Sequence, residues 1–152
     1  MSIHAIISLK EMVIFMNMTV LVNMIKQFNA IAVLNNYTIQ GPFTYSSMYH
    51  TKGKRSSYSC IKNFNNNYGI YIFTDLNDNI IYVGEASTQT IYIRIQNHFS
   101  NITGSLLKKA TLPVLLKSQI YLLIDNSSKI NKQKILFDEA LLIGICRPKY
   151  NF

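Results

Sequence analysis

The chain has 152 residues, of which 49% are hydrophobic and 14% charged, and its formal net charge is +8. This length suits one domain with a real hydrophobic core, and the composition gives no sign of a disordered chain. The charge favours a polyanionic partner such as nucleic acid, because basic side chains attract phosphates and release their counterions. A merely basic protein without such a partner would show the same excess.

Cysteine is too sparse for a zinc site. Only Cys60 and Cys146 occur, they form no Cys-x-x-Cys pair, and the three histidines are scattered. Two unpaired cysteines are typical of a reducing compartment, so we expect a cytoplasmic protein.

Residues 5–34 are apolar with polar breaks. The longest uninterrupted run, residues 12–22, is too short to span a bilayer, so we expect no membrane partner. Lys10 and Glu11 interrupt the apolar core that a signal peptide would need. Two interpretations stay open: one or two helices packed on the domain, or a later translation start at one of the internal methionines, which are Met12, Met16, Met18 and Met24.

Residues 35–67 change character, with turn-forming pairs such as Gly41-Pro42. A stretch rich in Tyr, Ser and Thr follows and contains Lys52, Lys54 and Arg55. Basic side chains can neutralise phosphates and tyrosines can stack on bases, so we expect these three residues to bind DNA. The alternative is an ordinary solvated basic loop.

A β-hairpin is predicted next. The run Tyr68–Phe73 is rich in aromatic and β-branched residues, and so is Ile80–Gly84. Residues 76–79, Leu-Asn-Asp-Asn, between them favour a turn, because Asn and Asp tolerate the left-handed conformation. The hairpin carries Tyr71 and Tyr82.

A short helix is predicted after the hairpin. Apolar residues recur every four positions at Ile91, Ile95 and Phe99, which is a helical stripe. Arg94 and His98 are also four positions apart, so they share the adjacent face.

The C-terminal third predicts a loop, a strand and a helix. Residues 100–110 are expected to form a loop in which Lys108 and Lys109 could face phosphate. Gln119–Asp125 predicts a third, buried strand, and residues 129–145 predict a helix. The later turns of that helix are apolar nearly all round, so we expect them to be buried.

Glu139 is the most informative carboxylate of this helix. A carboxylate among apolar residues costs several kcal/mol unless it is paired or binds a cation. The simpler alternative is an edge residue paired with a lysine, and the neighbouring Asp138 suits that solvated role better. A hard cation such as Mg²⁺ prefers oxygen ligands and keeps several waters, so one protein carboxylate can suffice.

In this order the motifs resemble the GIY-YIG nuclease family. Gly69-Ile70-Tyr71 and Tyr82-Val83-Gly84 match its two tripeptides, at the usual separation. Its helical arginine and histidine, late glutamate and terminal Pro-x-x-Asn match the remaining positions, which are Arg94, His98, Glu139 and Pro148–Asn151. The resemblance covers residues 68–152. Two departures are a longer loop before Arg94 and an acid, Glu85, where a small or basic residue is common.

The resemblance implies a Mg²⁺-dependent DNA endonuclease, with Mn²⁺ as an alternative cation. One motif tyrosine would take the proton of the attacking water, and we favour Tyr71 for this role and Tyr82 for a phosphate contact. Arg94 would clamp the scissile phosphate, His98 would contact phosphate or relay a proton, and Glu139 would hold the metal. The last motif residue, Asn151, would orient Glu139 or a tyrosine. Each residue also has an ordinary explanation. The tyrosines could simply be strand residues, and Arg94 could form a surface ion pair. His98 could cap the edge of the core, and Asn151 could belong to a disordered terminus.

We therefore predict an α/β domain over residues 68–152, preceded by an extension over residues 1–67 that is helical and then a basic loop. Its mainly antiparallel sheet would have three strands, near residues 68–75, 80–84 and 118–124, and helices near residues 90–100 and 129–145. Within the family we favour a compact restriction-type enzyme that cuts double-stranded DNA, and a homodimer would supply the two sites that cutting both strands needs. The alternatives are a structure-specific repair or recombination nuclease, a homing nuclease, or a catalytically inactive DNA-binding module.

Overall fold

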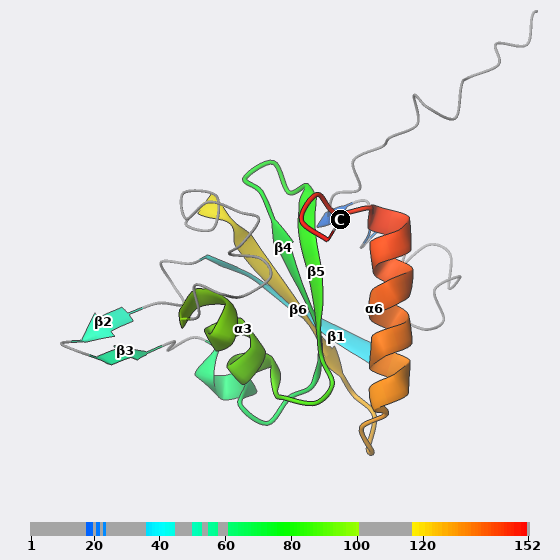
Figure 1. Ribbon diagram of the computed structural model, residues 1–152, viewed down its shortest axis with the longest axis horizontal. Coiled ribbons are helices and arrows are strands. Elements are labelled where there is room, and N and C mark those ends of the chain that lie inside the picture. The colour runs from blue at the N-terminus through cyan, green and yellow to red at the C-terminus, as the bar shows by residue number, and fades with distance from the viewer. Residues whose placement is uncertain are drawn as a thin grey trace, which may run out of the picture.

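The computed structural model describes residues 18, 19, 21, 23, 36–44, 50–52, 55–57, 61–100 and 117–151. Its centre is an antiparallel sheet in the order β1-β6-β4-β5 (Figure 1). The bounds of these strands are Tyr37–Thr44 for β1, Gly69–Thr74 for β4, Ile80–Ala86 for β5 and Gln119–Asp125 for β6. Helices α3 (Ile91–Ser100) and α6 (Lys132–Cys146) lie on opposite sides of the sheet. The predicted α/β class and antiparallel pairing are confirmed.

The prediction of three strands was wrong, because β1 is a fourth. Among the described strands it pairs with β6 alone, and it is an edge strand within the residues that we expected to form an extension. The pairing register shifts between Gln40 and Phe43, where the Gly41-Pro42 pair lies. Proline is tolerated at an edge or a bulge, since no ladder hydrogen bond depends on its missing N–H. The Gly41-Pro42 pair therefore interrupts the regular structure, but it does so inside a strand and not in a loop.

The segment that we expected to be a basic loop contains two short strands. β2 (His50–Lys52) pairs antiparallel with β3 (Arg55–Ser57) in a separate small sheet. A 3₁₀ turn, η2 (Lys62–Phe64), then leads into β4.

The predicted central hairpin, β4 with β5, is confirmed. In its turn, the Asp75 carboxylate accepts hydrogen bonds from the backbone N–H groups of Asn77 and Asn79, each at 2.9 Å. Asp78 has φ 65°, the left-handed conformation that Asp tolerates well. Local turn chemistry thus fixes the register that brings the two motif strands together.

The side chains of β4 point alternately to the two faces of the sheet, so they belong to two core clusters. Tyr71 and Phe73 pack toward α3, with Tyr82, Ile91 and Ile95. The alternate residues of β4 pack in the second cluster, toward α6, and this cluster contains Ile70, Ile72, Val83, Ile135 and Leu142. The strand period of two therefore points the motif tyrosines to the α3 side of the sheet.

Helix α6 begins at Lys132, later than predicted, and the Asn131 side chain caps it by accepting from the Lys134 N–H at 3.0 Å. Burial of its later turns on all sides was a wrong prediction. The helix packs one face on the sheet, while Leu136, Phe137 and Ile145 are exposed.

Asp138 does not have the solvated role that we expected. It is fully buried, and its carboxylate accepts hydrogen bonds from the Tyr37 hydroxyl at 2.7 Å and the Lys134 ammonium at 2.8 Å. It therefore ties β1 to α6, which explains how a charged residue is accommodated in the core.

The segment near residue 20 packs on the core. Met18 and Leu21 are buried in the cluster on the α6 side. The Met18 N–H donates to the Asp78 carbonyl at 3.0 Å, and the Thr19 hydroxyl donates to the Asp78 carboxylate at 3.1 Å. Of the helices in the described ranges, none has the length and apolar character needed to cross a membrane.

We expect Leu21→Ala to lower the free energy of unfolding by about 2–5 kcal/mol, because it removes a fully buried side chain and leaves a cavity. Leu76→Ala is the matched control, since Leu76 is 68% exposed. Chemical denaturation of both variants measures the difference. Equal stabilities for the two variants would show that this segment contributes nothing to the core.

Candidate active site

The site is built at the edge of the sheet, on strand β5. Because β4 is the one strand that pairs with β5 in the described sheet, side chains from the helices on both faces can reach around it. Arg94 comes from α3 on one side, and Glu139 comes from α6 on the other. Glu85 of β5 lies between them and interacts with both.

Tyr71 lies opposite Gly84 in the β4–β5 ladder. A Cβ atom at position 84 would collide with the Tyr71 ring and hydroxyl. Gly69 has φ 149°, and a Cβ there would collide with the Leu123 carbonyl. Both motif glycines therefore allow close approach, and Gly84 makes the space that the Tyr71 side chain occupies.

The Tyr71 hydroxyl forms a buried hydrogen bond with His98 Nε2 at 2.6 Å. Phe73 and Tyr82 pack around this pair, and the Tyr82 ring centroid is 5.4 Å from that of His98. Tyr71 is fully buried, whereas Tyr82 is 8% exposed. The strand and helix periods thus bring both motif tyrosines to the helical histidine.

Burial and the Arg94 charge lower the pKa of His98 from 6.5 to about 4, so its imidazole is neutral at pH 7. Burial, and next the neighbouring Tyr82, raise the pKa of the Tyr71 hydroxyl well above 10, although Arg94 opposes this shift. The hydroxyl therefore keeps its proton in the DNA-free protein and can donate it to the neutral ring.

Arg94 is fixed by Glu85. Its Nε donates to the Glu85 carbonyl at 3.1 Å, and its guanidinium lies 3.9 Å from the Glu85 carboxylate. The Ser87 N–H donates to the same carboxylate and holds it in place. Sequence reasoning noted Glu85 as a departure from the family but missed this pairing, which depends on the strand-to-helix connection.

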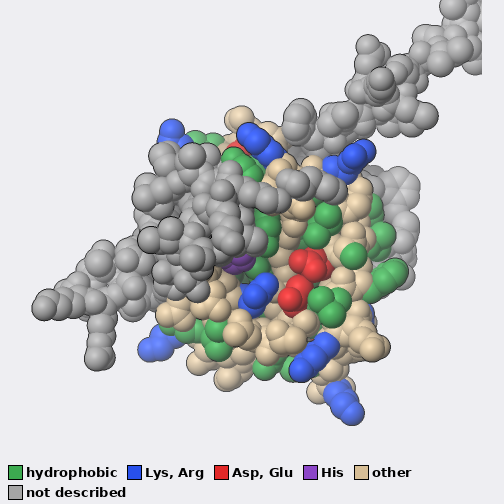
Figure 2. Space-filling model, in the orientation of Figure 1, with side chains coloured by type: hydrophobic (Ala, Val, Ile, Leu, Met, Phe, Trp, Pro, Cys, Tyr) green, Lys and Arg blue, Asp and Glu red, His purple; other side chains and the backbone are tan. Residues whose placement is uncertain are grey.

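Glu139 is half-buried, and its pKa is raised from 4.5 to about 7, first by desolvation and then by the charge of Glu85. The Arg94 charge and a hydrogen bond from the Glu85 backbone partly oppose the rise. Figure 2 shows two acidic side chains side by side next to a basic one on this face. We call Glu85 and Glu139 the carboxylate pair.

We expect Glu85→Gln to lower the pKa of the Glu139 carboxyl in metal-free protein, because it removes the nearby negative charge that raises it. The carboxylate form should then persist to lower pH. Carboxyl ¹³C chemical shifts recorded across a pH titration measure this, and Asp75→Asn in the hairpin turn is the control. A midpoint unchanged by Glu85→Gln would contradict the proximity of the pair.

Asn151 binds the backbone of the strand that carries Tyr82. Its side chain accepts from the Val83 N–H at 2.9 Å and donates to the Val83 carbonyl at 2.7 Å. The Tyr150 N–H also donates to the Ile81 carbonyl at 3.0 Å. These bonds pin the C-terminal residues to β5 on both sides of Tyr82, so Asn151 acts on the position of that strand.

The structure thus brings Tyr71, Tyr82, Arg94, His98 and Glu139 to one edge of the sheet, and Asn151 holds that edge. The predicted DNA-binding residues are not placed: Lys54, Lys108 and Lys109, together with the side chains of Lys52 and Arg55, lie outside the described residues.

Comparison with known proteins gives a consistent result. The family model of the GIY-YIG catalytic domain matches residues 67–136. Over 92 residues the chain is 36% identical to UvrABC system protein C of Aster yellows witches'-broom phytoplasma (strain AYWB). That alignment covers 60% of this chain but only 14% of the relative. No solved structure matches the chain significantly. These findings support the GIY-YIG family; Glu139 and Asn151 lie beyond the residues that the family model matches.

Proposed function

We propose that this chain is a DNA endonuclease of the GIY-YIG family that hydrolyses phosphodiester bonds. The observation that carries the proposal is the convergence at the β5 edge. Arg94 and Glu139 come from helices on opposite faces and both interact with Glu85, beside the Tyr71–His98 hydrogen bond. Phosphoryl transfer to water needs a positive group that binds the phosphate and a group that takes the proton of the water. The site offers an arginine for the first role and a tyrosine with a proton acceptor for the second, beside a carboxylate that could hold a metal ion.

The cofactor that we propose is Mg²⁺, with Mn²⁺ as the alternative. Glu139 is half-buried, and its pKa is raised first by desolvation and then by a second carboxylate, so a bound cation would stabilise its charged form. In the described part of the chain, no group of three or more His, Cys, Asp or Glu side chains could hold a metal. Hard oxygen donors with few protein ligands fit Mg²⁺, which keeps several waters, and Glu139 would hold it. When bound, the cation would offset the negative charge that develops on the leaving oxygen.

The residues of the chain would divide the remaining work. Arg94 would bind the scissile phosphate with its guanidinium fork. To do this, its guanidinium would move away from the Glu85 carboxylate. Tyr71 would take the proton of the attacking water and would pass its own proton to His98, whose neutral ring can accept it. Tyr82, the more exposed of the two tyrosines, would contact a phosphate oxygen.

For the biological role we retain a restriction-type enzyme that acts on double-stranded DNA in the cytoplasm, as a homodimer where both strands are cut. The chain spans 14% of the length of the relative that it matches, so the activity of that whole protein is not carried over. A structure-specific or homing nuclease is the alternative among enzymes.

The direct test is incubation of purified protein with plasmid DNA, with and without Mg²⁺, followed by sequencing of the ends. We expect Mg²⁺-dependent cleavage. Ends at one short sequence would favour the restriction-type role, whereas cleavage only of branched or damaged duplexes would favour the structure-specific alternative. Binding without cleavage under either cation would indicate an inactive DNA-binding module and would overturn the enzyme proposal.

A further inference from the structure

The turn that follows α6, residues 147–151, is held rigidly beside the candidate active site. Tyr150 and Asn151 bond the backbone of β5 at Ile81 and Val83, which flank Tyr82. Pro148 is buried within the turn and has a fixed φ. The turn therefore has a defined position next to a strand that carries a motif tyrosine.

Arg147 ends the helix in an unusual conformation for its residue type. Its φ is 46°, and its N–H donates to the Ile143 carbonyl at 2.9 Å. Glycine is the usual residue at such a helix end, because a side chain is disfavoured in the left-handed region. An arginine at this position therefore carries backbone strain that a glycine would avoid, so its guanidinium is a candidate for a functional role.

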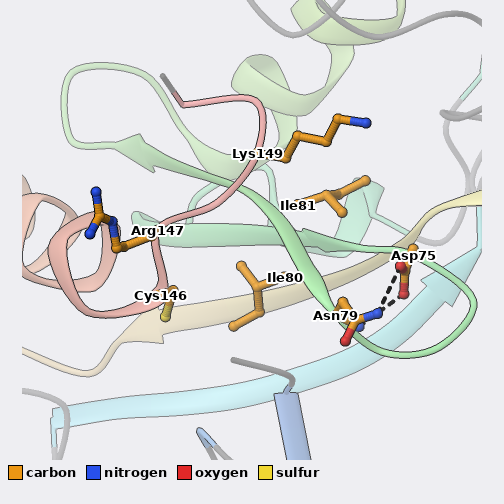
Figure 3. Close-up of a pocket in the computed structure, with 7 residues that line it drawn as sticks. All are labelled: Asp75, Asn79, Ile80, Ile81, Cys146, Arg147 and Lys149. Carbon is orange, nitrogen blue, oxygen red and sulfur yellow. Dashed lines mark hydrogen bonds between the residues drawn. The ribbon is translucent and has the colours of Figure 1, made fainter. Parts of the chain in front are cut away.

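Arg147 and Lys149 are both exposed, and neither forms an ion pair with any residue of the described ranges. With hairpin-turn residues they line a hollow of about 360 Å³ at the edge of β5, and Ile80, Ile81 and Cys146 line it too (Figure 3). In Figure 3 the two basic side chains leave the turn on different sides. Asp75, the acid at this hollow, is already bonded to Asn79.

We propose that this turn is a phosphate clamp, in which Arg147 and Lys149 bind the DNA backbone next to the cleaved position. The inference rests on the proposed function, since it concerns how the substrate lies across the same site. In the common orientation of Figures 1 and 2, basic side chains lie near the C-terminal turn, on the face that shows the neighbouring acidic side chains. One arginine cannot orient a duplex, and backbone contacts outside the reacting phosphate are what fix its register. The carboxylate pair would repel DNA, so flanking cations are needed to hold the backbone across it.

The test is the affinity for a short DNA duplex, measured by fluorescence anisotropy across a salt series with EDTA present so that no cleavage occurs. The variant is Arg147→Gly with Lys149→Gln. Each neutralised phosphate contributes about 0.9 to the log–log salt slope, so we expect the slope to fall by about 2. The control is Lys62→Gln with Lys117→Gln, which removes the same charge from two exposed positions on other elements.

A second measurement separates binding from folding. Arg147→Gly should raise the thermal stability, because glycine suits the left-handed position, while it weakens DNA binding. A loss of affinity through misfolding would change both in the same direction.

An unchanged salt slope in the clamp variant would overturn the clamp, and so would an equal fall in the control, which would show that only net charge matters. If wild-type protein binds no DNA, the proposed function fails and the clamp fails with it. Wild-type binding with an unaltered variant overturns the clamp alone.

Discussion

Glu139→Gln is expected to abolish cleavage while DNA binding survives. Glutamine keeps the size of the side chain but removes the charge that would hold a divalent cation. Loss of one preorganised electrostatic group at a reacting phosphate costs on the order of 10³ in rate, and here it would also remove the cation that the site needs. Single-turnover cleavage of plasmid and duplex affinity, measured on the same preparation, test both halves of the prediction.

The matched control is Asp138→Asn, the same chemical change one residue earlier in α6. Asp138 is fully buried and bonded to Tyr37 of β1 and to Lys134, rather than to the carboxylate pair. We expect this variant to be less stable but to cleave once folded. Mn²⁺ binding followed by titration calorimetry gives a readout independent of activity: it should weaken in Glu139→Gln only. A Glu139→Gln variant that cuts at the normal rate would show that Glu139 is not the metal ligand.

The contrast between these two acids shows where sequence reasoning reached its limit. Helix α6 is apolar on nearly all sides, so its pattern does not reveal which face meets the sheet. The sequence therefore placed Asp138 in solvent, although it is a core residue. The phase of the helix is fixed only by packing of Ile135 and Leu142 against the sheet, which is a tertiary effect.

Local signals were sufficient elsewhere. The hairpin, helix α3 and strand β6 follow from strand period, turn residues and helical spacing, all of which act within a few residues. The pairings that make the site could not be derived in this way. Tyr71 and His98 are 27 residues apart, and Glu85 meets Arg94 through a connection whose geometry no local pattern specifies. Strand β1 was missed because an edge position removes the penalty that proline would incur in a central strand.

The second large effect concerns the two motif tyrosines. Removing the hydroxyl of Tyr71 is expected to lower the cleavage rate more than removing that of Tyr82. Tyr71 is bonded to His98, is fully buried and faces the space left by Gly84. These contacts suit a group that exchanges a proton through a fixed partner. Tyr82 is slightly exposed and lies at the strand position that Asn151 holds, which suits a contact with substrate. Removing a general base typically costs about 10²–10⁴ in rate, and a positioning hydroxyl should cost less.

Phenylalanine substitutions decide between the two roles, because they remove only the hydroxyl and keep the ring packing. Single-turnover rates of Tyr71→Phe and Tyr82→Phe are measured across pH at saturating DNA. Because Tyr71 would pass its proton to His98, the relay needs a neutral imidazole, so the rate should stay level through the neutral range and fall as the pH approaches the His98 pKa of about 4. Tyr82→Phe should keep this profile at a lower rate, and Tyr71→Phe should lose most of its rate at every pH. A dead Tyr82→Phe beside a near-normal Tyr71→Phe would reverse the assignment. Near-normal rates in both variants would exclude a tyrosine base, since neither hydroxyl would then carry the proton of the attacking water.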